Sequence, residues 1–177
     1  MSHLSNLTLE LAEKSDFCNR YLELCSRYPR SLLMDSIDLA DRYPSSLANS
    51  TKKVVDHKLV KSIFDSLGYH YKYFGGEKFY RVYLWKGTEY EVWFHLQLYK
   101  NSIFDGYLDS HVYIIEHDEK YFAGGTFPCI FEGAGGVKPT KYMLRPAYTG
   151  EVLPELIKEL IDLAFSYVYE FEELKEG

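Results

Sequence analysis

The sequence predicts an α+β fold, and three observations support this prediction. Apolar residues recur at every third or fourth position before residue 68 and again after residue 151, a spacing typical of amphipathic helices. Between residues 69 and 131 apolar and polar residues alternate, as in strands that are buried on one side. The predicted arrangement is α+β, with N-terminal helices, a central antiparallel β-meander of about five strands and a long C-terminal helix.

The N-terminal part is predicted to form helices that end at prolines. Leu7, Leu11, Cys18, Leu22 and Cys25 share one face of a helix over residues 5–27, which Pro29 ends. A second helix is predicted over residues 31–42, and Pro44 ends it. The two ends share the pattern Arg-Tyr-Pro-x-Ser-Leu, which we interpret as a device that terminates helices.

A third helix and five strands are predicted next. Asp56 is a candidate N-cap for this helix, and Gly68 fits its C-terminal turn. The strands are expected at residues 69–74, 78–85, 89–99, 106–116 and 120–131, with mostly short turns between them. A three-residue loop between the second and third strands would place Trp85 opposite Glu89, Tyr83 opposite Glu91 and Arg81 opposite Trp93.

The C-terminal part is predicted to be irregular and then helical. Residues 132–150 are rich in Gly and contain Pro139 and Pro146, whereas a final helix begins near Glu151 with Pro154 in its first turn. A chain of 177 residues with 46% hydrophobic content can bury one core, so we expect a single domain over residues 1–177.

The predicted strands carry binding-type residues in the phase that should face water. Tyr90, Val92, Phe94 and Leu96 alternate as core residues require, but Trp93 and His95 lie between them. Trp, Tyr and Arg bury large areas and keep polar tips, which suits a surface that recognises a partner. The predicted partner-binding residues of the sheet are Arg81, Tyr83, Trp85, Glu91, Trp93, His95, Asp109, His111 and Tyr113.

Several patterns in the sequence are candidates for catalytic or ligand sites. Pairing of residues 89–99 with 106–116 would bring together His95, Asp109 and His111, a set that can bind a metal or act as a base and its orienting group. Their spacing matches no known signature, so we favour a polar contact surface. The glycine-rich residues 133–138 lack the Gly-Lys-Ser/Thr ending of a phosphate-binding loop, and Cys129 is expected to be buried in a strand. We therefore expect no catalytic residue, metal or cofactor.

The charge of the chain is concentrated at its C-terminal end. Residues 151–177 contain eight acidic residues and two lysines, which accounts for the whole net charge of −6. The remaining residues are neutral in sum and show no basic stripe, so direct nucleic-acid binding is not expected. Outward acids of the final helix, Glu155, Glu159 and Asp162, are candidates for attracting a basic protein partner.

The sequence also predicts a cytoplasmic protein. The N-terminus has no basic region followed by a continuous apolar stretch, and no run of apolar residues is long enough for a membrane span. The three cysteines, Cys18, Cys25 and Cys129, are an odd number in a chain that does not need disulfides, so we expect them to be reduced.

In type, this combination of small size, acidic charge and an aromatic-polar sheet resembles the immunity proteins that protect bacteria from polymorphic or contact-dependent growth-inhibition toxins. The resemblance rests on these properties and not on a shared motif. It implies a non-catalytic protein that binds and neutralises a cognate toxin, often a basic nuclease, in the bacterial cytosol. Two alternatives stay open: a small-molecule-binding domain or enzyme with its pocket between the sheet and the loop 133–148, and an adaptor that docks through its acidic helix.

Overall fold

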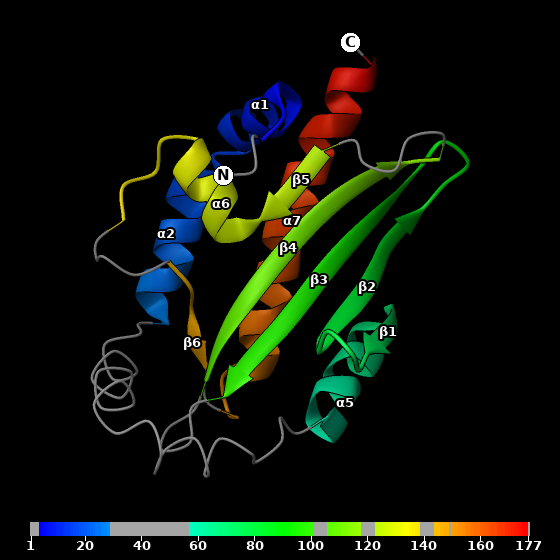
Figure 1. Ribbon diagram of the computed structural model, residues 1–177, viewed down its shortest axis with the longest axis vertical. Coiled ribbons are helices and arrows are strands. Elements are labelled where there is room, and N and C mark those ends of the chain that lie inside the picture. The colour runs from blue at the N-terminus through cyan, green and yellow to red at the C-terminus, as the bar shows by residue number, and fades with distance from the viewer. Residues whose placement is uncertain are drawn as a thin grey trace.

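The computed structural model describes residues 4–28, 57–100, 106–117, 123–138, 144–148 and 150–176. Its elements are α1 (Asn6–Lys14), α2 (Phe17–Arg27), α5 (His57–Leu67), β1 (His70–Phe74), β2 (Phe79–Lys86), β3 (Tyr90–Lys100), β4 (Gly106–Glu116), β5 (Ala123–Thr126), α6 (Phe127–Gly133), β6 (Ala147–Tyr148) and α7 (Leu153–Glu176). This order confirms the predicted α+β fold with a long C-terminal helix (Figure 1). Within the described ranges, no helix is both long and apolar enough to cross a membrane.

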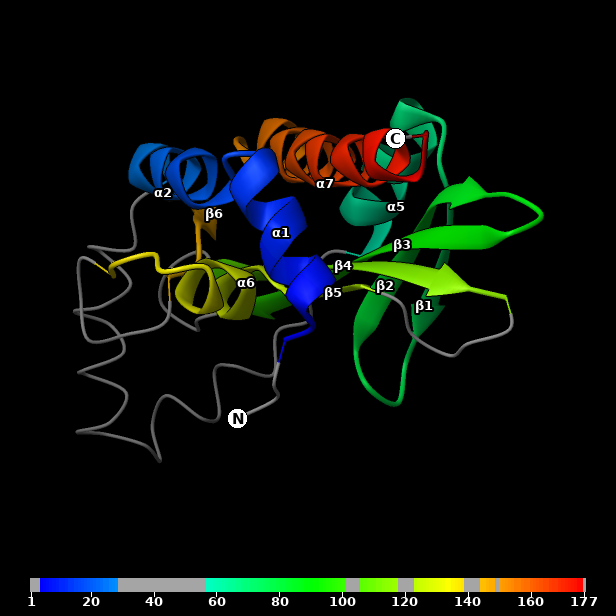
Figure 2. The same cartoon turned by 90° about the horizontal axis from the view of Figure 1, so that it is seen from above.

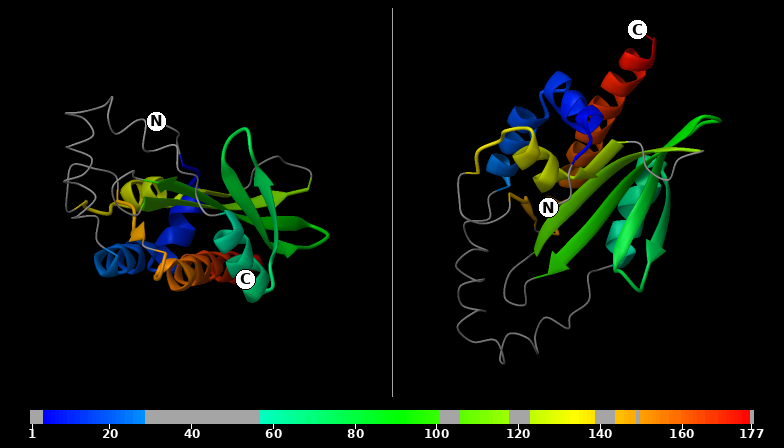
Figure 3. Two further views of the ribbon diagram at one scale, coloured as in Figure 1. Left: turned by 90° about the horizontal axis from the view of Figure 1, so that it is seen from below. Right: turned by 45° about the horizontal axis from the view of Figure 1, so that its top comes forward.

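The strands form one antiparallel sheet in the order β1-β2-β3-β4-β5, with β6 also paired to β4. Helices α2, α5 and α7 lie together on one side of this sheet (Figure 2), which we call the helix-side face. The β1–β2 hairpin bends away from the helices, as the views from above and below both show (Figures 2 and 3). The opposite side, which we call the outer face, is therefore curved inward.

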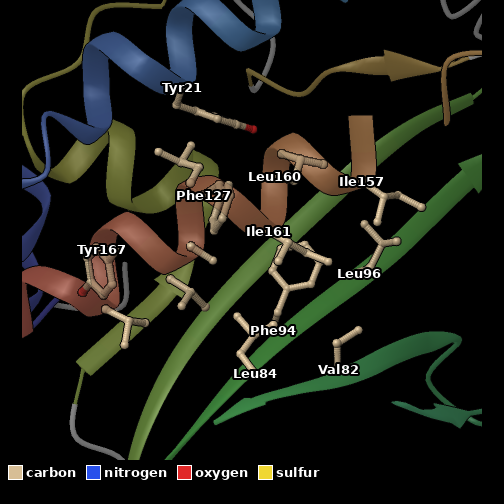
Figure 4. Close-up of a cluster of buried hydrophobic side chains, with 14 of the residues drawn as sticks. Tyr21, Val82, Leu84, Phe94, Leu96, Phe127, Ile157, Leu160, Ile161 and Tyr167 are labelled. Atoms are coloured by element: carbon tan, nitrogen blue, oxygen red, sulfur yellow. The ribbon is translucent and has the colours of Figure 1, made fainter. Parts of the chain in front are cut away.

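The hydrophobic core lies between α7 and the helix-side face of the sheet (Figure 4). Leu160 and Ile161 of α7 are buried beside Phe94 of β3, as the alternation in the strand predicts. The apolar residues that recur at helical spacing in α7, from Leu153 to Val168, are buried as a helix packed on the core requires, except Phe165, which is 36% exposed. Because α7 fills the middle of the helical layer, residues on its far side face away from the sheet.

The single helix predicted over residues 5–27 is wrong, because α1 and α2 are separate. The break falls at Ser15 and Asp16, and Asp16 has a left-handed backbone conformation with a φ of 54°. Asp is among the few side chains that tolerate this conformation, and the Ser15 hydroxyl donates to the carbonyl of Leu11 at the end of α1. The change of direction buries Phe17 against Phe127 of α6, with ring centroids 5.1 Å apart.

The strand predicted over residues 120–131 is also wrong in its second half. Of its described residues, Ala123–Thr126 form a strand, and the chain then turns into α6. The Thr126 hydroxyl accepts a hydrogen bond from the Cys129 amide, and Pro128 occupies the first turn, which together start a helix. Cys129 therefore lies on a helix and is partly exposed instead of buried in a strand.

The predicted register of β2 against β3 is wrong by two residues. Arg81 pairs with His95 and Tyr83 with Trp93, whereas Trp85 pairs with Val92 after a shift between Tyr83 and Trp85. The shift is a β-bulge, an extra residue in β2 that interrupts the alternation of faces. The bulge therefore changes the face of the sheet on which Trp85 lies.

Three predictions lie outside the described residues. The helix expected over residues 31–42 and the second copy of the Arg-Tyr-Pro pattern are in the segment 29–56, as is the candidate cap Asp56. Leu67 ends α5 as expected, and Gly68 follows it with a φ of +78°. The pairing of β6 with β4 was not predicted, because residues 132–150 show no strand pattern.

Candidate functional site

The candidate site is a groove on the outer face, formed by three neighbouring strands. The registers place His95 of β3 between Arg81 of β2 and His111 of β4. Trp93 lies in the same way between Tyr83 and Tyr113. These residues follow one alternation phase, so the prediction that they share a face is confirmed.

Arg81 is the central side chain of this groove. Its guanidinium carbon lies 3.6 Å from the ring centroid of Trp93 and 4.8 Å from that of Phe74. Its Nε donates a hydrogen bond to Nε2 of His95 over 3.0 Å. The predicted contact between a guanidinium and an indole is thus confirmed, although the two residues are diagonal neighbours rather than opposite each other. Two rings and one hydrogen bond together hold the guanidinium in a fixed orientation.

His95 is a neutral acceptor in this arrangement. Burial, the positive charge of Arg81 and the neighbouring His111 lower the pKa of His95 from 6.5 to about 3. Its Nε2 must carry a lone pair to accept from Arg81, so the ring proton is on Nδ1. The ring also lies 4.6 Å from that of Phe79 and 5.8 Å from that of His111. At neutral pH the charge of this group of side chains is therefore the single charge of Arg81.

His111 and Asp109 form a second, more buried group next to the groove. Nδ1 of His111 lies 2.9 Å from the Tyr113 hydroxyl, and burial lowers the pKa of His111. Asp109 accepts a hydrogen bond from Nη2 of Arg145 over 3.2 Å, and only 8% of its side chain is exposed. Arg145 also lies 5.5 and 5.4 Å from the rings of Tyr99 and Tyr107. The carboxylate is thus held by an arginine and is not open to the groove.

The groove has a volume of about 530 Å³, and its described lining residues belong to the strands and one turn of the sheet. Its lining comes from β2, β3, β4 and the β1–β2 turn, namely Glu77, Phe79, Arg81, Trp93, His95, Gln97, His111, Tyr113 and Ile115. Glu91 lies beside it, where its carboxylate accepts a hydrogen bond from the Trp93 indole over 2.9 Å. The walls are thus largely aromatic, with one fixed cation among them.

Trp85 does not belong to this groove, which corrects the prediction that both tryptophans share the outer face. The bulge in β2 turns Trp85 toward the helices, where it is 50% exposed. There it lines a second groove of about 670 Å³ with Leu84 and with Phe165 and Tyr169 of α7. We call this the helix-side groove.

The acidic residues proposed for partner attraction lie in the helical layer, on the opposite side of the sheet from the groove. Glu155 and Asp162 are exposed as predicted. Glu159 is partly buried and forms an ion pair with Arg27 of α2, so it is not a free outward acid. The structure therefore splits the predicted partner-binding residues between two surfaces that face in opposite directions.

Sequence reasoning missed some residues of the site. Phe79, Gln97 and Ile115 share the alternation phase of Arg81, His95 and Tyr113, so the same pattern would have found them. Arg145 gave no such signal, because its position depends on the unpredicted pairing of β6 with β4.

In the described part of the chain, Asp109 and His111 are not placed as a metal site or as a catalytic base with its orienting group. In the described part of the chain, no group of three His, Cys, Asp or Glu side chains is placed to hold a metal ion. The basic group nearest to Asp109 is Arg145, whereas Nε2 of His111 lies 3.9 Å from the carboxylate, which is too long for the hydrogen bond that orients a catalytic base. Comparisons with known protein families, with curated proteins and with solved structures found no match for this chain.

Proposed function

We propose that this chain is a non-catalytic immunity protein that binds and neutralises a cognate protein toxin, of the basic nuclease type, in the bacterial cytosol. The observation that carries the proposal is the fixed stack of Arg81 on Trp93 in a groove of the outer face. Arg and Trp are the residue types that most often dominate binding energy in protein interfaces, because they bury large areas in fixed orientations.

The charge of the chain supports a basic partner. The net charge is −6, and it produces a long-range field that accelerates the approach of a positively charged protein. The aromatic groove would then supply the short-range contacts that slow dissociation. The acidic helix and the groove would act at different stages, which is compatible with their position on opposite sides of the sheet.

The alternative of a small-molecule pocket between the sheet and the loop 133–148 stays a prediction. Among the described residues, the lining of the groove on the outer face comes from the strands and the β1–β2 turn, and includes none from the described part of this loop. Arg145 of this loop donates a hydrogen bond to Asp109, which is one of the predicted partner-binding residues.

The two tryptophans allow a matched test of the proposal. The chain is co-expressed with the toxin encoded beside it, and cell growth and the dissociation constant of the complex are measured. Trp93→Ala should weaken binding by about 2 kcal/mol or more and reduce protection, whereas Trp85→Ala should have little effect. A stronger effect of Trp85→Ala would move the interface to the helix-side groove, and full protection by both variants, or no neighbouring toxin, would contradict the proposal.

A further inference from the structure

Arg81 is a partly buried arginine without a carboxylate partner among the described residues. Arg27 pairs with Glu159 and Arg145 with Asp109, and Arg20 is exposed to solvent. Arg81 is partly buried, yet among the described residues no Asp or Glu lies within ion-pair distance of it. Buried charges are normally paired, so an oriented arginine without a counter-charge in a groove indicates that the counter-charge comes from a ligand.

The orientation of Arg81 determines what it can bind. Its flat face is covered by Trp93, and its Nε is used by His95. The two terminal nitrogens, Nη1 and Nη2, are the donors that no described residue engages, and they form the edge of the fork. A carboxylate matches this edge with two parallel hydrogen bonds, and the guanidinium loses little freedom on binding because the rings already hold it.

The surroundings of Arg81 favour one negative charge on an apolar body. His95 is neutral because its pKa is about 3, so it adds no positive charge near neutral pH. Glu77 at the turn adds a negative charge to the lining, which disfavours phosphates and other multiply charged anions. Phe79, Tyr113 and Ile115 supply apolar walls beside Arg81. The charge and the walls together select a monoanion with an attached apolar or aromatic group.

We propose that the outer-face groove is a carboxylate-recognition site, in which Arg81 binds an acidic side chain that the partner protein presents next to an apolar residue. This inference rests on the proposed function for the source of the carboxylate. A basic toxin still carries individual acidic residues, and one such residue in this groove would fix the orientation of the complex. The long-range attraction would then come from the negative net charge of this chain, whereas the specific contact would be made by the positive charge of Arg81.

The proposal is tested with small probes on the purified chain. Phenylacetate carries the carboxylate on an aromatic body, phenylacetamide is its neutral counterpart, and phenyl phosphate carries a larger charge. The indole N–H signals of Trp93 and Trp85 in a ¹H–¹⁵N spectrum report the outer face and the helix-side groove separately. Phenylacetate should shift the Trp93 signal and leave Trp85 unchanged, with a dissociation constant on the order of 1 to 10 mM for a ligand of about ten heavy atoms.

Variants of Arg81 establish the cause of binding. Arg81→Gln should weaken phenylacetate at least about tenfold, whereas Arg20→Gln in the helix-side groove should leave it unchanged. Arg81→Lys keeps the charge without the fork, so it should give an intermediate loss and serves as the test if Arg81→Gln does not fold. Equal binding of phenylacetamide, tighter binding of phenyl phosphate, unchanged binding in both Arg81 variants or no shift of Trp93 would each overturn the proposal.

The titration is independent of the toxin. A failed titration overturns the carboxylate site and leaves the tryptophan test of the toxin interface standing. If phenylacetate binds as expected but Trp93→Ala does not affect the complex, the recognition site is supported and its assignment to the toxin interface is overturned.

Discussion

The two faces of the same three strands differ in almost every property that matters for stability and binding. On the helix-side face, Val82, Phe94 and Val112 are completely buried under the helical layer. On the outer face, their immediate neighbours Arg81 and His95 line an open groove. Alternation along a strand therefore places adjacent residues in the core and in the groove. Substitution of the buried residue should lower stability, whereas substitution of its neighbour should weaken binding.

The largest expected effect separates the two faces at neighbouring positions of β3. Phe94→Ala removes a fully buried ring and should lower the free energy of unfolding by about 3 to 5 kcal/mol. Trp93→Ala removes a partly exposed ring and should cost about 1 kcal/mol. Urea unfolding of both variants measures this contrast. Equal losses would mean that the outer face contributes to the core as much as the helix-side face does.

The next effect concerns the buried ion pair between Arg145 and Asp109. Arg145→Met leaves the Asp109 carboxylate buried without its arginine and should destabilise the fold by about 3 kcal/mol. The double variant Arg145→Met/Asp109→Asn should recover part of this loss, because no unpaired charge remains. Lys138→Met, which breaks a more exposed pair with Glu132, is the control and should cost no more than about 1 kcal/mol. A cost for Arg145→Met as small as that of the control would contradict the burial of Asp109.

A smaller, pH-dependent effect is expected at His95. The unfolded imidazole takes up a proton near pH 6.5, whereas the folded one does so near pH 3, so the unfolded state binds more protons between these values. The folded chain should therefore lose stability as the pH falls from 6.5, by no more than about 3 kcal/mol at pH 4 for this residue. His95→Gln should reduce this slope, and His70→Gln, exposed in β1, should not. Thermal melts between pH 4 and 7 measure it, and equal slopes in all three proteins would show that His95 is not protected from protonation.

The sequence predicted the faces well and the breaks in regular structure poorly. Alternation depends on local backbone geometry, so the strand β4 and the common face of Arg81, Trp93 and His95 were found from the pattern alone. The bulge at Leu84 was not found, because one extra residue changes the face of Trp85 without changing the composition of the strand. The left-handed conformation of Asp16 and the start of a helix at Thr126 were not predicted for a similar reason, since each depends on one or two residues within an apolar run.

The candidate site was predicted in part. The residues that share an alternation phase were brought together as expected, including His95, Asp109 and His111. The pairing of Asp109 with Arg145 was not predicted, because the two residues are joined only through a short strand in an irregular segment. The position of the α7 acids relative to the groove was not predicted, since the sequence does not say on which side of the sheet a terminal helix packs.

The smallest expected effect concerns these acids and tests whether the two sides of the molecule act separately. Glu155→Gln/Asp162→Asn removes two exposed charges on the side away from the groove. If the toxin docks on the outer face, association should slow by about twofold at 0.01 M salt, where the Debye length is about 30 Å, and should be unchanged at 0.15 M, where it is about 8 Å. Dissociation should not change, because no contact is lost. Stopped-flow association and dissociation measure both rates, with Trp93→Ala as the variant expected to change dissociation instead. Faster dissociation of the double variant would place α7 inside the interface and remove the separation of the two faces.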